Sequence, residues 1–362
     1  MTKLRHMYPG ANSCRGFYSF YQYMLWPEGE RKIILKGGPG VGKSTFMEKI
    51  AEAFSSHGLD MEYHCCSSDN QSLDGIVIGQ KICILDGTAP HVVDPLFPGA
   101  MDEILNLGDF WDSRIIKEHK NEVIKLGQEI SRCFSRAYLR LQEAAAAYEE
   151  WQSYYKEARD PATVKRNILA LSQEILQDCS VSPYELRHLF AAAITPAGPV
   201  TRIESLVDHD YSLYALKGSP GSGSKELLNH VAYMLKLQQY YGEVYHSPFE
   251  PQEIDLIILP EQKTALLDFS SYIINYGDKI SAKQKRLLDF DELIHKSLID
   301  PHAGRVFSAR NRFDESLQGA VEFIRKAKQF HDELESFYIP AMDFTALENL
   351  RTELLQQLMA EL

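Results

Sequence analysis

The pattern of apolar and polar positions predicts a short buried strand followed by an amphipathic helix at two places in the chain. Apolar residues dominate Lys32–Lys36 and Ser212–Lys217, and each run has the length of a strand. Behind the first run, four apolar residues recur at helical spacing, namely Met47, Ile50, Ala51 and Phe54. Gly58 follows them and predicts the end of this helix.

Further apolar runs and long charged segments complete the predicted architecture. The runs near Met61–Cys66 and Gly75–Asp86 predict two more strands after the first helix. The segments Ile116–Gln177 and Ala282–Leu362 are rich in Leu, Ala, Glu and Lys and contain few helix breakers, so we expect long helices there. Because strands and helices alternate, the sequence predicts an α/β fold with mainly parallel sheets, each followed by a helical subdomain.

The chain also repeats itself at a spacing of half its 362 residues. The matches occur in the same order in both halves, which chance does not readily explain. They pair Leu4-Arg5-His6 with Leu186-Arg187-His188, Lys36–Gly42 with Lys217–Gly223, Tyr63-His64 with Tyr245-His246, and Leu85-Asp86 with Leu267-Asp268. We therefore predict two tandem units of one plan, residues 1–183 and 184–362.

Composition and charge narrow the class of protein. With 44% hydrophobic and 24% charged residues, the sequence is that of a globular protein. No apolar run reaches the roughly 18–20 residues needed to span a bilayer, and the first residues lack the apolar core of a signal peptide. The six cysteines form no CxxC pair, which is typical of reduced thiols, so we expect a cytoplasmic protein. The formal net charge of −12 argues against nucleic-acid binding, which usually requires a basic excess.

The first Gly-rich segment matches the phosphate-binding pattern G-x-x-x-x-G-K-[ST] at every position. It runs Gly37-Gly38-Pro39-Gly40-Val41-Gly42-Lys43-Ser44 and is followed by Thr45. Its glycines allow the backbone to curve around a phosphate, with N–H groups pointing inward and the positive end of the next helix nearby. A Gly-rich turn could match the pattern by accident, but its position between a predicted strand and a predicted helix favours a P-loop, or Walker A motif.

Each polar side chain of this loop has an expected contact with a nucleoside triphosphate, and we predict ATP with Mg²⁺. Lys43 would contact the β- and γ-phosphates, and the Ser44 hydroxyl would bind Mg²⁺. Thr45 could reach an oxygen of the α-phosphate. The chain contains no Asn-Lys-x-Asp element for recognising guanine, which favours adenine.

A carboxylate downstream of the loop is the second predicted Mg²⁺ group. The apolar run Ile82–Asp86 has the features of a buried strand that ends in Asp86, and such an Asp holds Mg²⁺ in P-loop proteins, directly or through water. The alternative is an ordinary Asp at a strand end. In the loop that follows, His91 or Asp94 could orient an attacking water, or His91 could merely cap a turn shaped by Gly and Pro. Because Gly87 follows Asp86, the Asp-Glu pair of many ATPases is missing and no hydrolytic base is identified.

Two further polar groups lie on the predicted strands of the first unit. Asp74 could reach Mg²⁺ through a bound water, or it could simply begin a strand. His64, Cys65 and Cys66 resemble a metal cluster, but adjacent residues on a strand point to opposite faces. No second ligand pair stands at zinc spacing, so a structural role is favoured for these three residues.

The second copy of the loop departs from the pattern at its functional positions. Ser224 stands where the first copy has Lys43, and Lys225 stands where it has Ser44. Glu226 follows and would repel a triphosphate. Because the loss of one charge-stabilising donor costs about 3–4 kcal/mol in comparable sites, we expect a degenerate nucleotide site that supports or regulates the first.

The motifs together resemble a bacterial family of tandem P-loop ATPase-like proteins over nearly the whole chain. The residues that carry the resemblance are Leu4-Arg5-His6, Gly37–Thr45, Tyr63-His64-Cys65, Ser72-Leu73-Asp74-Gly75 and Asp86–His91. The resemblance implies nucleotide binding in a cytoplasmic setting. In that family the second unit generally also resembles a P-loop domain, and Ser224 and the altered loop after Asp268 depart from this.

Three functional hypotheses follow from these observations. The first is a slow or partner-regulated Mg²⁺-dependent ATPase with one active and one degenerate site. In this hypothesis an unidentified protein partner could regulate turnover. The second is a small-molecule or nucleotide kinase, for which Arg132, Arg136 or Arg140 could supply a lid arginine. The third is a nucleotide-responsive interaction protein that does not hydrolyse its ligand, an idea favoured by the missing catalytic Glu.

Overall fold

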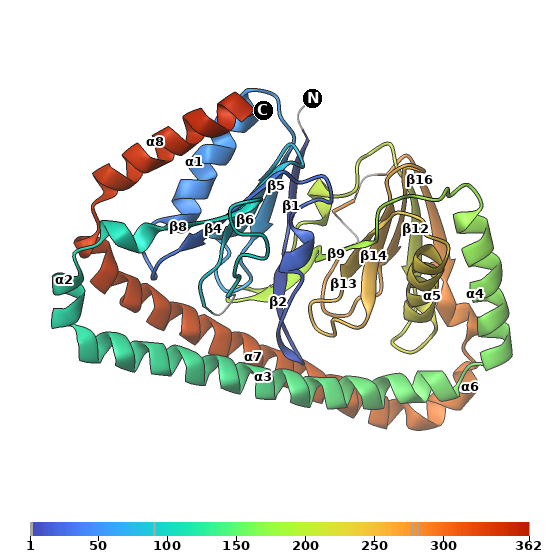
Figure 1. Ribbon diagram of the computed structural model, residues 1–362. Coiled ribbons are helices and arrows are strands. Elements are labelled where there is room, and N and C mark those ends of the chain that lie inside the picture. Colours follow the sequence, from blue (N-terminus) through green and yellow to red (C-terminus); the bar gives the residue numbers. More distant parts are fainter. Residues whose placement is uncertain (1–2, 90–91, 277–278, 281, 362) are drawn as a thin grey trace. The chain divides into compact units, whose positions relative to one another are not determined.

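The computed structural model describes residues 3–89, 92–276, 279–280 and 282–361, and these residues contain two six-stranded sheets (Figure 1). The first sheet has the order β1-β5-β6-β7-β4-β8, with the strands Leu4–Met7, Met61–Cys65, Leu73–Ile78, Ile82–Asp86, Arg31–Lys36 and Asp102–Asn106. The second has the order β9-β13-β14-β15-β12-β16, with the strands Arg187–Phe190, Glu243–His246, Ile254–Leu259, Thr264–Asp268, Ser212–Lys217 and Gln284–Asp289. The two orders correspond strand by strand, and the predicted α/β class with two P-loop-like units is confirmed.

One strand in each sheet runs against the others. In the first sheet β6 pairs antiparallel with both β5 and β7, whereas β1–β5, β7–β4 and β4–β8 pair in parallel. The sequence predicted one strand region over Gly75–Asp86, and the structure divides it into the hairpin β6–β7. Gly79 and Gln80 form the turn with φ of 55° and 65°, the left-handed values that two-residue hairpin turns require.

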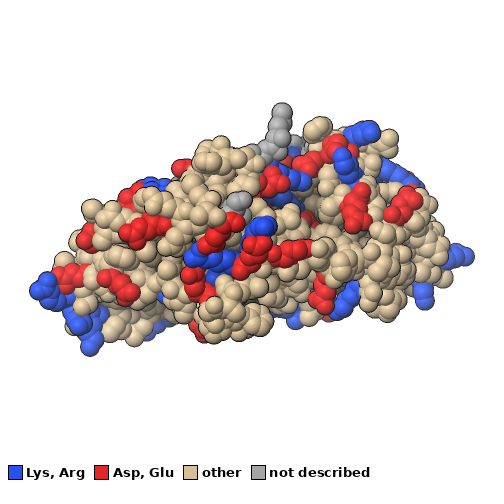
Figure 2. Space-filling view, turned by 45° about the horizontal axis from the view of Figure 1, so that its top comes forward, with Lys and Arg blue, Asp and Glu red and all other residues tan. Residues whose placement is uncertain are grey.

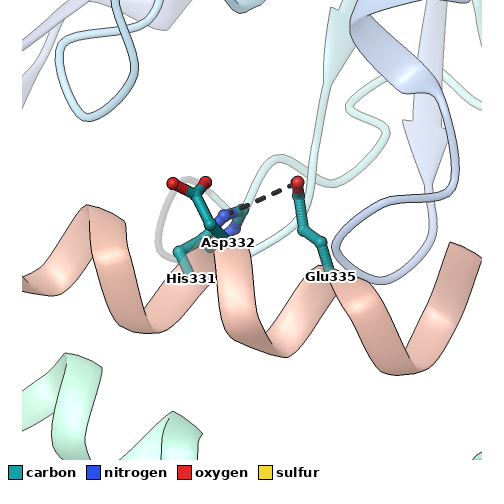
Figure 3. Close-up of side chains that lie close together, drawn as sticks. All are labelled: His331, Asp332 and Glu335. Carbon is teal, nitrogen blue, oxygen red and sulfur yellow. Dashed lines mark ion pairs between the residues drawn. The ribbon is translucent and has the colours of Figure 1, made fainter.

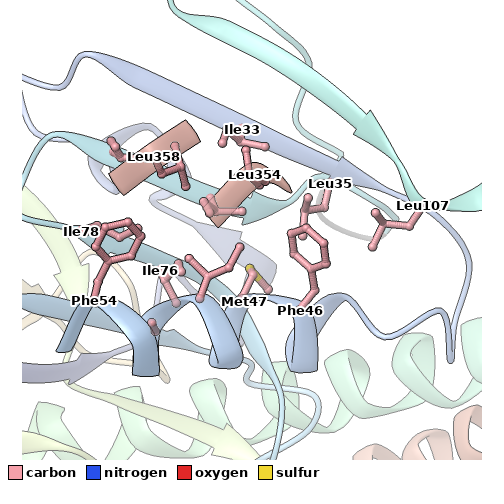
Figure 4. Packing of buried hydrophobic residues seen from close by; sticks show 14 of the residues in the cluster. Ile33, Leu35, Phe46, Met47, Phe54, Ile76, Ile78, Leu107, Leu354 and Leu358 are labelled. Atoms are coloured by element: carbon pink, nitrogen blue, oxygen red, sulfur yellow. The ribbon is translucent and has the colours of Figure 1, made fainter. Parts of the chain in front are cut away.

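A helix follows the loop strand of each sheet. Helix α1 covers Lys43–Ser56, and the four apolar residues predicted for its inner face are all buried. They pack against β4 and β6, as Figure 4 shows for Met47 and Phe54 beside Ile76 and Ile78. Helix α5, Ser224–Leu237, occupies the same place beside the second sheet.

The compact units of the structure do not follow the two sequence halves. The first unit consists of Met1–Pro9, Ser19–Ser135 and Phe323–Leu362, and the second of Gly10–Tyr18 and Arg136–Glu322. The division at residue 183 therefore remains a prediction about the sequence repeat. In space, the last 40 residues, Phe323–Leu362, belong with the first sheet.

The long helices explain why the compact units differ from the sequence halves. Helices α3 (Lys120–Glu157) and α7 (Ala303–Tyr338) are continuous, and each contributes one part to each unit. Helix α8, Phe344–Glu361, lies along α1 in the first unit and buries Leu347, Leu354 and Leu358 in its core (Figures 1 and 4). Helix α4, Pro161–Leu176, packs against α5 in the second unit.

The prediction of helix throughout Ala282–Leu362 was wrong at its start. Gln284–Asp289 forms β16, which pairs in parallel with β12 at the edge of the second sheet. This strand is largely exposed and carries Lys285 and Arg286. Charged side chains are how edge strands avoid further pairing, and they also made this segment resemble an exposed helix in the sequence. Among the described residues, none of the helices is long and apolar enough to cross a membrane.

The packing of α8 against the first unit leads to a test by core truncation. Leu358 is fully buried, so Leu358→Ala is expected to lower the free energy of unfolding by about 2–4 kcal/mol through lost burial and a cavity. Met359→Ala is the matched control, because the neighbouring side chain is 39% exposed. Urea-induced unfolding measures both variants, and equal effects of the two substitutions would contradict the placement of α8.

Candidate functional site

The Gly-rich loop of the first unit turns the chain from the end of β4 into the start of α1. Gly40 and Gly42 have φ of 68° and 87°, values that residues with a Cβ rarely adopt. Gly42 is the residue that caps α1, and no side chain bonds to the first N–H groups of this helix from that position. The loop therefore has the backbone conformation and the helix N-terminus that a phosphate-binding loop needs.

The amino group of Lys43 lies inside the loop. Its Nζ donates to the carbonyl oxygens of Gly37 (3.1 Å) and Gly38 (2.9 Å) and lies 3.5 Å from Oδ2 of Asp86. Asp86 ends β7, which pairs directly with β4, and the register places Asp86 opposite Leu35. The fold thus brings together Lys43 and Asp86, two of the predicted catalytic residues, at the carboxyl ends of neighbouring parallel strands.

Ser44 and Asp86 also have the chemistry of a Mg²⁺ site. The Ser44 hydroxyl accepts from the N–H of Leu73 (3.0 Å) and donates to Glu48 (3.3 Å). One oxygen of Asp86 accepts from the N–H of Thr88 (2.9 Å) and from its hydroxyl (2.5 Å), while the other faces Lys43. A hydroxyl and a carboxylate oxygen are hard ligands that suit Mg²⁺, so these residues fit the predicted ion.

Asp74 adds a second buried carboxyl group. It is 3% exposed on β6, the strand next to β7, and is the second residue of that strand. Burial is the main effect and raises the pKa of Asp74 to about 7. Hydrogen bonds from Cys66 and Tyr21 partly oppose this increase, whereas the negative charge of Asp86 adds to it. Because burial and a nearby carboxylate both disfavour its ionised form, the surroundings of Asp74 would gain from a bound cation.

The loop after Asp86 is held by one lysine. Lys36 donates from Nζ to the carbonyl oxygens of Gly87 (2.8 Å) and Val93 (2.8 Å) and to the carboxylate of Asp94 (3.1 Å). Asp94 is thus tied into an ion pair, and its role in orienting water remains a prediction. The third predicted catalytic residue, His91, lies outside the described residues.

The end of α7 covers the loop, a feature that the sequence did not predict. Glu335 accepts from the N–H of Gly40 (3.2 Å) through Oε1. Tyr338 and Trp111 lie against Gly38, where an added Cβ would come within 2.8 Å of the Tyr338 ring. Residues 40 and 335 are 295 positions apart, and no motif marks the later segment. No local pattern in the sequence could therefore have identified this contact.

Three neighbouring polar side chains on α7 could hold a metal ion but do not form a metal centre of their own. His331, Asp332 and Glu335 place one ligand atom each within 4.8 Å of one another (Figure 3). His331 Nδ1 lies 3.5 Å from the Glu335 carboxylate, which already accepts from Gly40, and Asp332 pairs with Lys328. Their existing partners account for all three groups.

The His64-Cys65-Cys66 segment has a structural place on β5 and just after it. All three residues are buried, and His64 lies 3.4 Å from the carboxylate of Glu62. The Cys66 thiol lies beside Asp74, and burial raises its pKa, with the Asp74 charge raising it further. Among the described residues, these three form no metal-ligand group.

The position of the second unit that corresponds to Ser44 holds a lysine, Lys225. Lys225 Nζ bonds to the carboxylate of Asp255, lies 3.1 Å from Oδ2 of Asp268 and donates to the carbonyl oxygen of Ile254 (3.2 Å). Asp268 ends β15 opposite Leu216, as Asp86 ends β7 in the first sheet. Burial lowers the pKa of Lys225, but the charges of Asp255 and Asp268 raise it well above its ordinary value. The lysine therefore stays charged between two buried carboxylates.

The surroundings of Asp74 lead to a test by pH. An unfolded Asp has a pKa of about 4, whereas that of folded Asp74 is about 7, so the folded protein binds the extra proton between these values. The wild type should therefore lose stability relative to Asp74→Asn as pH rises from about 4 to about 7, by roughly 1 kcal/mol per pH unit, and the difference should level off at about pH 8. Urea unfolding of both proteins between pH 5 and 8 measures this, and a difference independent of pH would contradict it.

Residues 33–109 match a family model described as RNA helicase. The matched segment begins in β4 and ends just after β8, so it contains the loop, Asp74 and Asp86, while the long helices lie outside it. No curated protein sequence and no solved structure shows a significant match to the chain. The match, the strand–loop–helix geometry and the sheet order agree that this segment is a P-loop NTPase-type domain of the nucleotide-binding kind.

Proposed function

We propose that the first unit binds ATP with Mg²⁺ and hydrolyses it slowly or under the control of a protein partner. The observation that carries the proposal is the position of Lys43, whose amino group lies between the loop carbonyls and Asp86. When a triphosphate binds, the loop N–H groups would hold its phosphates, and Lys43 would leave the carbonyls of Gly37 and Gly38 to contact the β- and γ-phosphates. Ser44 and Asp86 would hold Mg²⁺, which neutralises charge that develops on the transferred phosphoryl group.

Slow turnover follows from what occupies the loop. The Glu335 carboxylate accepts from Gly40 N–H, a group of the kind that binds phosphate oxygens in such loops. A triphosphate must displace this carboxylate, and negative charges close together repel each other. The chain after Asp86 supplies no adjacent Glu as a base. A partner that moves the end of α7 would relieve the competition and would thereby regulate turnover.

The features of the second unit support the proposal that the protein has a single active site, in the first unit. Ser224 cannot supply the charge that Lys43 supplies, and the ammonium group of Lys225 fills the space between Asp255 and Asp268. A divalent cation at that position would have to displace a buried positive charge that is held by two carboxylates. We therefore assign nucleotide turnover to the first unit alone.

Two alternatives remain tied to particular observations. In the first sheet β7 pairs directly with β4, a strand order that also suits a small-molecule or nucleotide kinase. ADP release that depends on an added acceptor would identify a kinase. The missing base favours a nucleotide-responsive interaction protein, for which binding without phosphate release would be the sign.

RNA is not part of the proposal, although the matched family model is described as RNA helicase. The net charge is −12, and on the face in Figure 2 acidic side chains lie among the basic ones. Binding to a polyanion requires an excess of positive charge. A cytoplasmic setting is part of the proposal, because ATP is plentiful there and the scattered cysteines, which form no CxxC pair, are typical of reduced thiols.

Substitution of Lys43 tests the proposed function. We expect isothermal titration with ATP and Mg²⁺ to show one nucleotide per chain, and Lys43→Ala to weaken binding by about 100-fold or more through loss of the phosphate-binding charge. Lys81→Ala is the control, because Lys81 is an exposed lysine of the same unit that pairs with Glu30. No ATP binding by the wild type, or equal binding by Lys43→Ala, would refute the proposal.

Substitution of Glu335 tests the proposed restraint on the loop. Glu335→Gln removes the charge that competes with phosphate, so ATP affinity should rise by about three- to ten-fold, and basal phosphate release at low ATP should rise with it. Glu333→Gln is the control, because this side chain is exposed on the same helix. Unchanged affinity would remove Glu335 as a competitor, and a large loss of turnover with unchanged affinity would assign it to the reaction itself.

A further inference from the structure

A groove leads away from the loop between α1 and α8. Its cavity volume is about 140 Å³, and its wall includes Gly42, Thr45 and Lys49 on one side and Phe344, Glu348 and Arg351 on the other. All of these residues belong to the first unit. This volume lies below the range of enclosed small-molecule sites, which is about 300–1,000 Å³, so the groove can hold one flat face of a ligand and leaves the other face in solvent.

The position of the groove fixes which part of a nucleotide could enter it. Gly42 is the last glycine of the loop, and Thr45 stands at the position expected to reach the α-phosphate. A triphosphate whose β- and γ-phosphates lie at Lys43 therefore has its α-phosphate at the mouth of the groove. The atoms that follow the α-phosphate are those of the ribose and the base.

The chemistry of the groove suits those atoms. The Phe344 ring is 45% exposed although it lies on the groove wall, and its edge is 3.6 Å from where a Cβ on Gly42 would stand. An exposed ring beside a buried Leu347 offers a flat apolar face on which a base can stack. Lys49 and Arg351 both pair with Glu348, so the polar rim carries two cations and one carboxylate and is positive overall.

We propose that this groove is the nucleoside subsite of the first unit, in which the base of the triphosphate stacks on Phe344 and its polar edge faces Glu348 and Arg351. The inference rests on the proposed nucleotide binding by the loop and adds the residues that recognise the nucleoside. It gives α8 a role in recognition besides its role in the core. The two parts of the binding site then come from opposite ends of the chain.

Comparison of ATP with tripolyphosphate tests the subsite, because tripolyphosphate carries the phosphates without a nucleoside. The wild type should bind ATP at least about ten-fold more tightly than tripolyphosphate in the presence of Mg²⁺, and Phe344→Ala should weaken ATP by about five- to a hundred-fold, the range for loss of one base–aromatic stack. Its affinity for tripolyphosphate should be unchanged, which also shows that the variant is folded. Phe307→Ala, at a 64% exposed Phe of the second unit, is the matched control.

The outcomes separate the subsite from the function of the loop. Equal affinity of the wild type for ATP and tripolyphosphate, or an unchanged ratio in Phe344→Ala, would overturn the subsite and leave the loop as a phosphate site. Binding of neither ligand would overturn both the subsite and the proposed function. Phe344→Trp keeps an aromatic face, so its fluorescence change relative to that of the wild type, in which Trp111 already lies against Gly38, should appear on addition of ATP and be absent with tripolyphosphate, and the opposite result would also overturn the subsite.

Discussion

The rest of the structure depends on the meeting of a positive charge and a carboxylate at the ends of two neighbouring parallel strands. In the first unit Lys43 meets Asp86, and in the second Lys225 meets Asp268. Both contacts follow from the same sheet order, in which the strand before the Gly-rich loop pairs directly with a strand ending in Asp. The hairpins β6–β7 and β14–β15 place further carboxylates, Asp74 and Asp255, next to these ends. A sheet built this way places several negative charges at the ends of its central strands, and these charges need nearby positive charge.

The parts of the site that the sequence predicted are those encoded locally. The loop, Lys43, Ser44 and Asp86 lie within one strand–loop–helix segment and the strand paired with it, so motif and apolar pattern were enough. The turn at Gly79 and Gln80 was missed because the apolar run continues on both sides of it. The edge strand β16 was missed because its charged residues resemble an exposed helix.

The covering of the loop could not be predicted, and the repeat itself is the reason. The two halves have similar apolar patterns, so the inner face of α8 is compatible in principle with either α1 or α5, and so is that of α4. Periodicity shows that a helix has an apolar face, but not which of two similar helices that face contacts. Glu335 and Phe344 therefore emerge only from the three-dimensional arrangement, in which residues from the end of the chain lie against the loop near its start.

The two units compensate the negative charge of the carboxylates at the strand ends by different means. In the second unit the positive charge belongs to the chain itself, because the Lys225 ammonium group lies between Asp255 and Asp268. In the first unit Ser44 replaces that lysine, and the pKa of Asp74, raised to about 7 by burial, reflects how poorly its negative charge is accommodated. A ligand that binds only the folded state stabilises it by RT ln(1 + [L]/Kd). Under the proposed function, Mg²⁺ and nucleotide would supply this stabilisation to the first unit, whereas in the second unit the Lys225 side chain already provides the positive charge. Under the proposed function, the presence of Lys instead of Ser at this position would make the second unit independent of the ligand that the first unit binds.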